Sequence, residues 1–187
     1  MGGEPFRSHD VTAGDDLLAG QVAYYRRRAS EYDVTAYSGL DAARARITRI
    51  MAALRPAANV LEIACGTGLW TEALARAVRT VTAIDAAPEM IDIARARVTA
   101  AHVRFEVADV FTWSAPERFD TVFFAFWLSH VPASRFEQFW RQLHGLVARQ
   151  GRCCSSMSIQ TSAARRTMRQ AARRSSTGGW ATAPSTA

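Results

Sequence analysis

The sequence predicts an α/β protein whose core is a doubly wound, mainly parallel β-sheet. Two observations support this prediction. Short apolar stretches alternate with helical patterns from residue 59 onward, and glycines or acidic residues follow several of the apolar stretches. Strands that alternate with helices are joined by right-handed crossovers and lie parallel. Ligands of such sheets bind at the carboxyl ends of the strands, so we expect the functional residues there.

Strands and helices account for most of the predicted domain. We expect strands over residues 59–64, 80–85, 103–108 and 119–126, and helices over residues 21–32, 41–54, 69–77, 88–99 and 134–147. In the second of these helices Ile47, Ile50, Met51 and Leu54 recur at helical spacing, and Arg55-Pro56 ends it. The predicted domain spans residues 21–152, and residues 1–20 are expected to form a flexible polar lead-in.

The composition is that of an ordinary globular protein. Of the 187 residues, 49% are hydrophobic and 21% are charged. No apolar run reaches the roughly 18–20 residues that a membrane span needs, and the first residues lack the pattern of a signal peptide. We therefore expect a cytoplasmic protein without a membrane partner. The three cysteines have neither a disulfide framework nor zinc-ligand spacing, so no metal is expected.

The net charge of +6 comes almost entirely from the end of the chain. All 23 basic side chains are Arg; five of them lie after residue 152, where there is no Asp or Glu, so the first 152 residues hold 18 basic and 17 acidic side chains. A nearly neutral body argues against a nucleic-acid partner, which normally requires a basic surface.

Residues that suit a nucleotide-like ligand stand at three successive strand ends. Gly66 and Gly68 follow the first strand, where they allow a tight turn and the close approach of a ligand. The turn opens the helix over residues 69–77, whose free N–H groups offer a polar cradle. Asp85 ends the second strand and can accept both hydroxyls of a ribose, because a carboxylate has two acceptor oxygens. Asp109 ends the third strand beside the same crevice.

The glycine turn distinguishes two cofactor classes. A dinucleotide-binding fingerprint requires Gly-x-Gly-x-x-Gly or Ala, but this chain has Gly-Thr-Gly-Leu-Trp-Thr from Gly66. Trp70 and Thr71 fit poorly against a pyrophosphate, and Glu62 is unexpected in such a site. A nicotinamide-dependent oxidoreductase is therefore the more remote alternative.

The stretch instead resembles the first motif of class I S-adenosylmethionine-dependent methyltransferases, an acid followed by small-x-Gly-x-Gly. Most members have Gly where Ala64 stands. The resemblance extends from about Tyr24 to Arg152, and includes the segments over residues 28–33 and 124–132. It implies a doubly wound, Rossmann-like sheet and S-adenosylmethionine as the cofactor.

The resemblance also implies residue roles. The turn contacts the methionine part of the cofactor, Asp85 binds the ribose, Ala86 and Met90 flank the adenine, and Asp109 with Val110 meets its edge. The turn residues concerned are Glu62, Ala64, Cys65, Gly66 and Gly68. Simpler interpretations stay open: Met90 as a core methionine, Asp109 as a turn cap, and Cys65 as a small turn residue rather than a nucleophile.

A methyltransferase of this kind needs little catalytic machinery from the protein. The sulfonium methyl is already electrophilic, so the protein mainly aligns the acceptor with it. His130, just past the fourth strand, is the best-placed base; the alternative is that it only anchors the loop before Val131-Pro132. Five aromatic residues are expected either to form the wall of a pocket for a small-molecule acceptor or to pack in the core. They are Tyr24, Tyr25, Tyr32, Phe126 and Trp127. An inactive remnant that still binds the cofactor is the alternative function.

Residues 153–187 do not continue the pattern. The family's fold calls for a fifth apolar strand and further elements after residue 152, but a basic, low-complexity tail follows. We expect this tail to be disordered or out of frame, so that the fold lacks its last strands. The use of Arg alone suggests a GC-rich gene. Back-translated with GC-rich codons and read from the last base of the Arg152 codon, residues 152–160 encode Val-Leu-Phe-Val-Asp-Glu-His-Pro. The hypothesis is that one g was lost there, and the coding DNA is its test.

Overall fold

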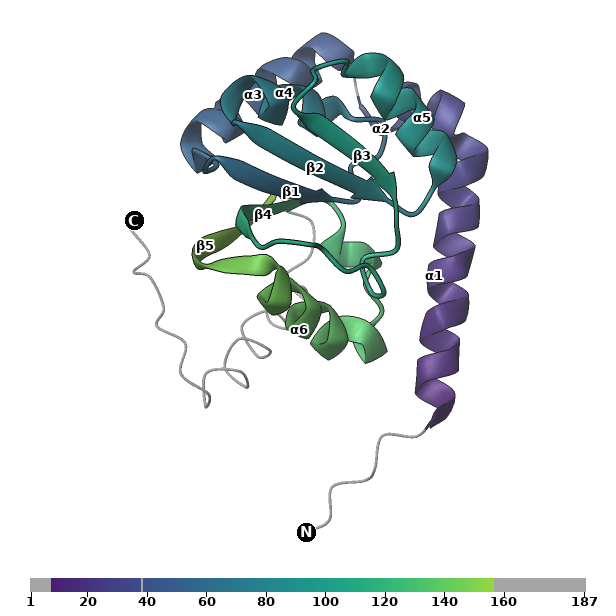
Figure 1. The fold of residues 1–187 in the computed structure, drawn as a ribbon. Coiled ribbons are helices and arrows are strands. Elements are labelled where there is room, and N and C mark those ends of the chain that lie inside the picture. The colour runs from purple at the N-terminus through teal and green to yellow at the C-terminus, as the bar shows by residue number, and fades with distance from the viewer. Residues whose placement is uncertain (1–7, 38, 157–187) are drawn as a thin grey trace. The chain divides into compact units, whose positions relative to one another are not determined.

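The fold is built on a five-stranded parallel sheet (Figure 1). The computed structural model describes residues 8–37 and 39–156, with side chains from Gly14 onward. The strands are β1 (Asn59–Ile63), β2 (Thr80–Asp85), β3 (Val103–Val107), β4 (Phe119–Ala125) and β5 (Val147–Ser156). Their order is β3-β2-β1-β4-β5, and every neighbouring pair is parallel. The strand order reverses between β1 and β4, which is where a doubly wound sheet offers its ligand crevice. The predicted fold class is confirmed.

Helices cover both faces of the sheet (Figure 1). One face carries α3 (Leu40–Leu54), α4 (Leu69–Ala77) and α5 (Pro88–Arg97), and the other carries α6 (Phe136–Leu146). The helix α1 (Ser8–Arg28) runs past the carboxyl ends of the strands, followed by a 3-10 turn (Ala29–Glu31) and by α2 (Tyr32–Ala36). Two further 3-10 turns, η2 (Leu128–His130) and η3 (Ala133–Arg135), connect β4 to α6.

The core lies between the sheet and these helices. Strands β1 and β4 read as nearly continuous apolar runs because both of their faces are covered. Val60, Leu61, Phe123 and Phe124 are each at most 1% exposed. The burial of these side chains fixes the register of the strands, and with it the position of their carboxyl ends.

The N-terminal segment corrects one expectation. Residues 8–20 belong to α1, so the expected flexible lead-in is wrong over that stretch; residues 1–7 lie outside the described residues. Two glycines and a polar composition weaken the helical pattern, but tertiary packing outweighs local propensity. Gly14 is buried against η3, where a Cβ would lie 2.6 Å from Ser134 Oγ. The glycine therefore allows close packing of α1.

The carboxyl end of the described chain corrects a second expectation. Residues 153–156, expected to belong to a disordered tail, continue β5 and pair with residues 122–125 of β4. The pairing register shifts near Phe119, as at a β-bulge. Gly151 suits this irregularity because a Cβ there would lie 2.8 Å from the Phe119 carbonyl oxygen. The rest of the tail, residues 157–187, lies outside the described residues.

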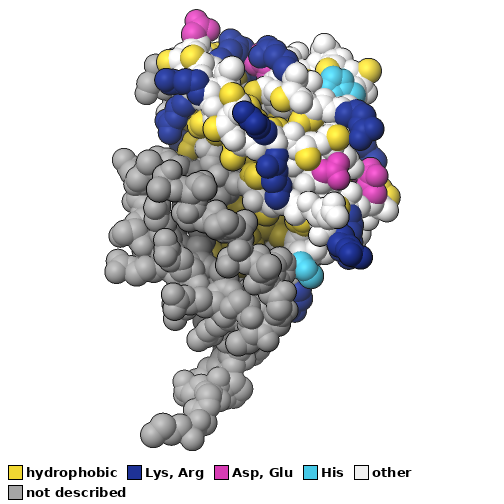
Figure 2. Space-filling model, turned by 90° about the vertical axis from the view of Figure 1, so that its left-hand side faces the viewer, with side chains coloured by type: hydrophobic (Ala, Val, Ile, Leu, Met, Phe, Trp, Pro, Cys, Tyr) yellow, Lys and Arg dark blue, Asp and Glu magenta, His cyan; other side chains and the backbone are white. Residues whose placement is uncertain are grey.

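Charged side chains are dispersed on the face shown in Figure 2. Arginines lie among acidic and apolar side chains there and do not form one continuous basic patch. In the described part of the chain, no helix has the length and hydropathy of a membrane-spanning segment.

Candidate functional site

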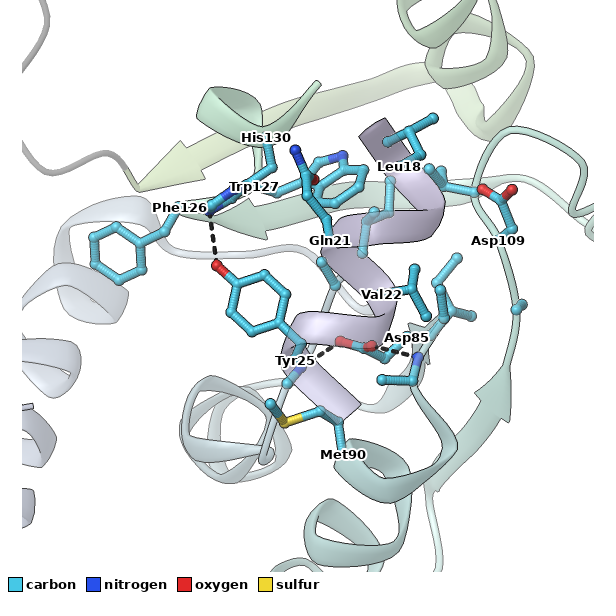
Figure 3. A pocket seen from close by; sticks show the side chains of 18 of the residues that line it. Leu18, Gln21, Val22, Tyr25, Asp85, Met90, Asp109, Phe126, Trp127 and His130 are labelled. Atoms are coloured by element: carbon cyan, nitrogen blue, oxygen red, sulfur yellow. Dashed lines mark hydrogen bonds between the residues drawn. The ribbon is translucent and has the colours of Figure 1, made fainter. Parts of the chain in front are cut away.

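A cavity of about 340 Å³ opens at the carboxyl ends of the strands, beneath α1 (Figure 3). The floor comes from the ends of β1, β2 and β4 and the segment after β3, and one wall comes from α1. The lining residues are Asp15, Leu18, Ala19, Gln21, Val22, Tyr25, Tyr32, Ile63, Ala64, Gly66, Ile84, Asp85, Ala86, Ala87, Met90, Ala108, Asp109, Val110, Ala125, Phe126, Trp127 and His130.

The glycine turn after β1 has the backbone conformation that its sequence implies. Ala64, Gly66 and Gly68 have positive φ values of 54°, 56° and 79°. A Cβ on Gly68 would lie 2.9 Å from the Cβ of Ala94, so only glycine lets the turn pack against α5. A Cβ on Gly66 would meet nothing within 4 Å, because this residue borders the cavity. Ala64 and Gly66 thus line the cavity, while Gly68 holds the turn in place behind it.

Asp85 presents a fixed carboxylate to the cavity. Its Oδ2 accepts a hydrogen bond of 2.9 Å from the Gly66 N–H, and its Oδ1 accepts one of 2.9 Å from the Ala87 N–H. Burial raises the pKa of Asp85, and these backbone donors act in the opposite direction. Each oxygen retains a further acceptor position. Ala86 and Met90 lie beside this carboxylate in the cavity wall.

Asp109 fits both of the interpretations that the sequence left open. It lines the cavity together with Val110. It also caps a turn, since its Oδ1 accepts a hydrogen bond of 2.9 Å from the Phe111 N–H. Met90 likewise belongs to a buried cluster with Ala29 and is 2% exposed, yet it borders the cavity.

Glu62 and Cys65 lie away from the cavity lining. The Glu62 side chain is 2% exposed, and its Oε2 accepts a hydrogen bond of 2.6 Å from the Thr71 hydroxyl on α4. Burial raises the pKa of Glu62 to about 8, the Thr71 hydrogen bond opposing this shift in part. Burial also raises the pKa of the Cys65 thiol, so the geometry fits a small turn residue rather than a nucleophile.

Tyr25 and His130 form a pair at the other end of the cavity. The distance from Tyr25 Oη to His130 Nε2 is 3.1 Å, and the two rings meet edge to face. Burial lowers the pKa of His130 and raises the pKa of Tyr25. Both groups are therefore neutral near pH 7, and the tautomer of the imidazole decides which of them donates. Phe126 and Trp127 complete this end of the lining.

The two neighbouring tyrosines of α1 have different surroundings. Tyr25 lines the cavity together with Tyr32, whereas Tyr24 is 43% exposed and its hydroxyl accepts a hydrogen bond from Arg28. Tyr25 therefore lines this cavity and Tyr24 does not, whereas both border a neighbouring pocket together with Gln21 and His130.

Five further residues of α1 line the cavity and were not expected there from the sequence. Asp15, Leu18, Ala19, Gln21 and Val22 all line the cavity. The signal that identifies this face is the spacing of Leu18, Val22 and Tyr25, which is i, i+4, i+7. Following that spacing backward from Tyr25 would have extended the helix into the presumed lead-in.

A partly buried ionic cluster links α2 to the glycine turn. Arg97, the last residue of α5, donates from Nη1 to the Thr67 carbonyl oxygen at 2.8 Å and to Thr67 Oγ1 at 3.0 Å, and donates from Nη2 to Asp33. The Thr67 hydroxyl in turn donates to Asp33 Oδ1 at 2.6 Å. The side chains of Arg97 and Asp33 are 15% and 17% exposed. We call Asp33, Thr67 and Arg97 the clamp; it connects the segment above the cavity to the turn at its floor.

Comparisons with known proteins agree with this geometry. A family described as "Methyltransferase domain" matches residues 60–151. The solved DhpI-SAM-HEP complex is 39% identical, with a TM-score of 0.69 over 82% of this chain and 71% of DhpI. The chain belongs to the class I S-adenosylmethionine-dependent methyltransferases. The alternative of a nicotinamide-dependent oxidoreductase is therefore rejected.

Curated methyltransferase relatives match over a shorter stretch. Nodulation protein S of Rhizobium tropici is 43% identical over 68 residues, which is 36% of this chain and 29% of that protein. Ubiquinone biosynthesis O-methyltransferase of Xanthomonas campestris pv. campestris (strain B100) is 42% identical over 81 residues, 41% of this chain and 34% of that enzyme. The matched region thus spans about a third of the length of these relatives.

Proposed function

We propose that this chain binds S-adenosylmethionine and transfers its methyl group to a small-molecule acceptor. The observation that carries the proposal is the Asp85 carboxylate, held by two backbone N–H groups at the end of β2 with both oxygens beside the cavity. Such a carboxylate suits the two neighbouring hydroxyls of a ribose. Two kinds of relative support S-adenosylmethionine as the cofactor: DhpI, which was solved as a complex with SAM, and a protein named as an O-methyltransferase.

The size and lining of the cavity support this choice of cofactor. A volume of about 340 Å³ is that of a small-molecule pocket. In the proposal Asp85 holds the ribose, Ala86 and Met90 flank the adenine, Asp109 and Val110 meet its edge, and the turn at Ala64 and Gly66 receives the methionine part. When bound, the cofactor supplies an electrophilic methyl group.

The remaining lining residues would position the acceptor. The helix α1 covers the cavity and limits the access of water, and Tyr32 and Trp127 supply aromatic side chains to its wall, with Phe126 at its border. The sequence proposed His130 as a base or as a loop anchor. The hydrogen bond between Tyr25 Oη and His130 Nε2 leaves this nitrogen without a free position for a substrate proton, which favours the anchoring role.

A second candidate function is cofactor binding without turnover. The observation that favours it is the short match to the curated relatives, about a third of their length. In either case we infer no nucleic-acid partner, supported by the 18 basic and 17 acidic side chains of residues 1–152. The cytoplasmic location stays a prediction from the sequence.

The test is calorimetric titration with S-adenosylhomocysteine, the demethylated product of the cofactor, which binds without reacting. Asp85→Ala removes two charge-assisted contacts worth about 1.5–3 kcal/mol each, so affinity should fall by about 150-fold or more. Asp92→Ala is the control, because Asp92 lies on α5 with a side chain 77% exposed. Equal affinity of wild-type and Asp85→Ala proteins would remove the ribose assignment. Methyl transfer to any acceptor in a metabolite screen then separates enzyme from remnant.

A further inference from the structure

Two buried polar atoms at the His130 end of the cavity lack a hydrogen-bond partner. They are Gln21 Oε1 on α1 and Trp127 Nε1 in the segment after β4. Both residues line the cavity, and Figure 3 shows them beside His130 at the end opposite Met90. A buried polar atom without a partner costs about 1–3 kcal/mol, and native proteins leave few of them. Such a pair at a cavity wall indicates where a ligand supplies the missing partners.

The chemistry of the two atoms restricts that ligand. An indole N–H only donates, and an amide oxygen only accepts. The ligand group must therefore accept from Trp127 and donate to Gln21. A hydroxyl does both, whereas a carboxylate has no proton to donate and an ammonium has no lone pair to accept with.

The charge of the lining disfavours an anion. Three aspartates line the cavity, Asp15, Asp85 and Asp109, and no Lys or Arg does so among the described residues. Arg135 pairs with Asp15 and compensates for that one charge. The remaining two carboxylates repel a negative ligand in a site partly shielded from water.

The rest of this end is apolar or aromatic. Phe126 borders the cavity, but its ring points away toward Trp70. Leu18 and Val22 face the cavity from α1, and Trp127 faces it from the segment after β4. These side chains offer a hydrophobic surface that suits a ring or a short hydrocarbon, with few polar groups to fix its orientation.

We infer that this end of the cavity holds an uncharged, largely apolar molecule through one hydroxyl, set between Gln21 and Trp127. The inference rests on the proposed function, of which this molecule would be the acceptor or an analogue of it. Phenols are the simplest compounds with this combination of groups.

The test compares three probes that share a ring: 4-methylphenol, 4-methylanisole and 4-methylbenzoate. Binding is measured by ligand-observed NMR, with and without S-adenosylhomocysteine. 4-Methylphenol should bind about 2–13-fold more tightly than 4-methylanisole, which has lost the hydroxyl proton and so one neutral hydrogen bond. 4-Methylbenzoate should bind most weakly. The inference is overturned if 4-methylbenzoate binds as well as the phenol, or if the phenol shows no preference over the anisole.

Variants assign the preference to the two side chains. In the double variant Gln21→Leu, Trp127→Phe the phenol and the anisole should bind equally, because neither partner for the hydroxyl remains. Trp140→Phe is the matched control: Trp140 Nε1 is also buried without a partner, but Trp140 does not line the cavity. A double variant that keeps the preference contradicts the inference.

Two further measurements make the result unambiguous. Gln21→Leu should leave the midpoint of thermal unfolding unchanged or raise it, because it removes an unpaired polar group; a fall of several degrees would show that Gln21 has a partner. S-adenosylhomocysteine binding is measured on the same proteins. Binding of S-adenosylhomocysteine without phenol preference contradicts only this inference, and the reverse result contradicts only the proposed function.

Discussion

Arg97 should contribute more to stability than any exposed arginine of α5, because it joins three parts of the molecule in the clamp. Arg97→Ala removes the ion pair with Asp33 and both hydrogen bonds to Thr67. Breaking a fully buried ion pair costs about 3–5 kcal/mol. The side chains of Arg97 and Asp33 are 15% and 17% exposed, so water partly compensates for the lost ion pair. We expect the free energy of unfolding to fall by about 2–3 kcal/mol.

Urea unfolding followed by circular dichroism measures this change, and the melting temperature should fall by about 4–12 °C. Arg95→Ala is the matched control. Arg95 lies two residues away on α5, is 53% exposed, and contacts Asp92 at 3.9 Å and the Phe105 carbonyl oxygen at 3.1 Å. Its replacement should cost about 0.5 kcal/mol. The reasoning is refuted if the two variants lose the same stability. A double-mutant cycle with Asp33→Ala should show a coupling of about 1–3 kcal/mol.

Two further predictions concern Glu62 and the glycines. Burial raises the pKa of Glu62 from 4.5 to about 8. Between these pH values the folded state keeps a proton that the unfolded chain releases. The free energy of unfolding should therefore fall as pH rises from about 4.5 to 8, by up to about 1.4 kcal/mol per pH unit. Glu62→Gln should remove this part of the dependence in urea titrations at pH 5–8.5, and an unchanged slope would contradict the assignment. Gly68→Ala, with φ of +79° and a Cβ 2.9 Å from Ala94, should lose about 2–4 kcal/mol. Gly145→Ala, with open space around its Cβ, should gain up to about 1 kcal/mol in the same denaturation assay; similar losses in both would count against the packing argument.

The elements that the sequence predicted well are those with local signals. The β-branched and apolar run of β1 and the glycines after it specify a strand and a turn within ten residues, residues 59–68. The position of Asp85 then follows from the parallel topology, because carboxyl ends of neighbouring strands lie together. The fold class and the strand-end acids could therefore be predicted without the structure.

The elements that were missed depend on distant contacts. Gly14 weakens the pattern of α1 locally, and only its packing against Ser134 explains its presence in a helix. Asp33 and Arg97 are 64 residues apart in the chain, and nothing near either residue in the sequence indicates the other. Strand β5 was underestimated because Cys153 and Ser155 have little of the apolar character expected there, although they pair with β4.

The backbone of Phe126 has a consequence for how this site can evolve. Its φ of +58° places a bulky aromatic residue in the left-handed region, immediately after β4. For a side chain with a Cβ this conformation costs about 1–2 kcal/mol, and glycine would avoid the cost. The ring centroids of Phe126 and Trp70 lie 6.2 Å apart, and Phe126 borders the cavity. The packing of the Phe126 ring offsets the strain of its backbone. Neutral drift at position 126 should therefore run toward glycine or asparagine. Lineages that keep an aromatic residue there are the ones in which selection still acts on the wall of this cavity.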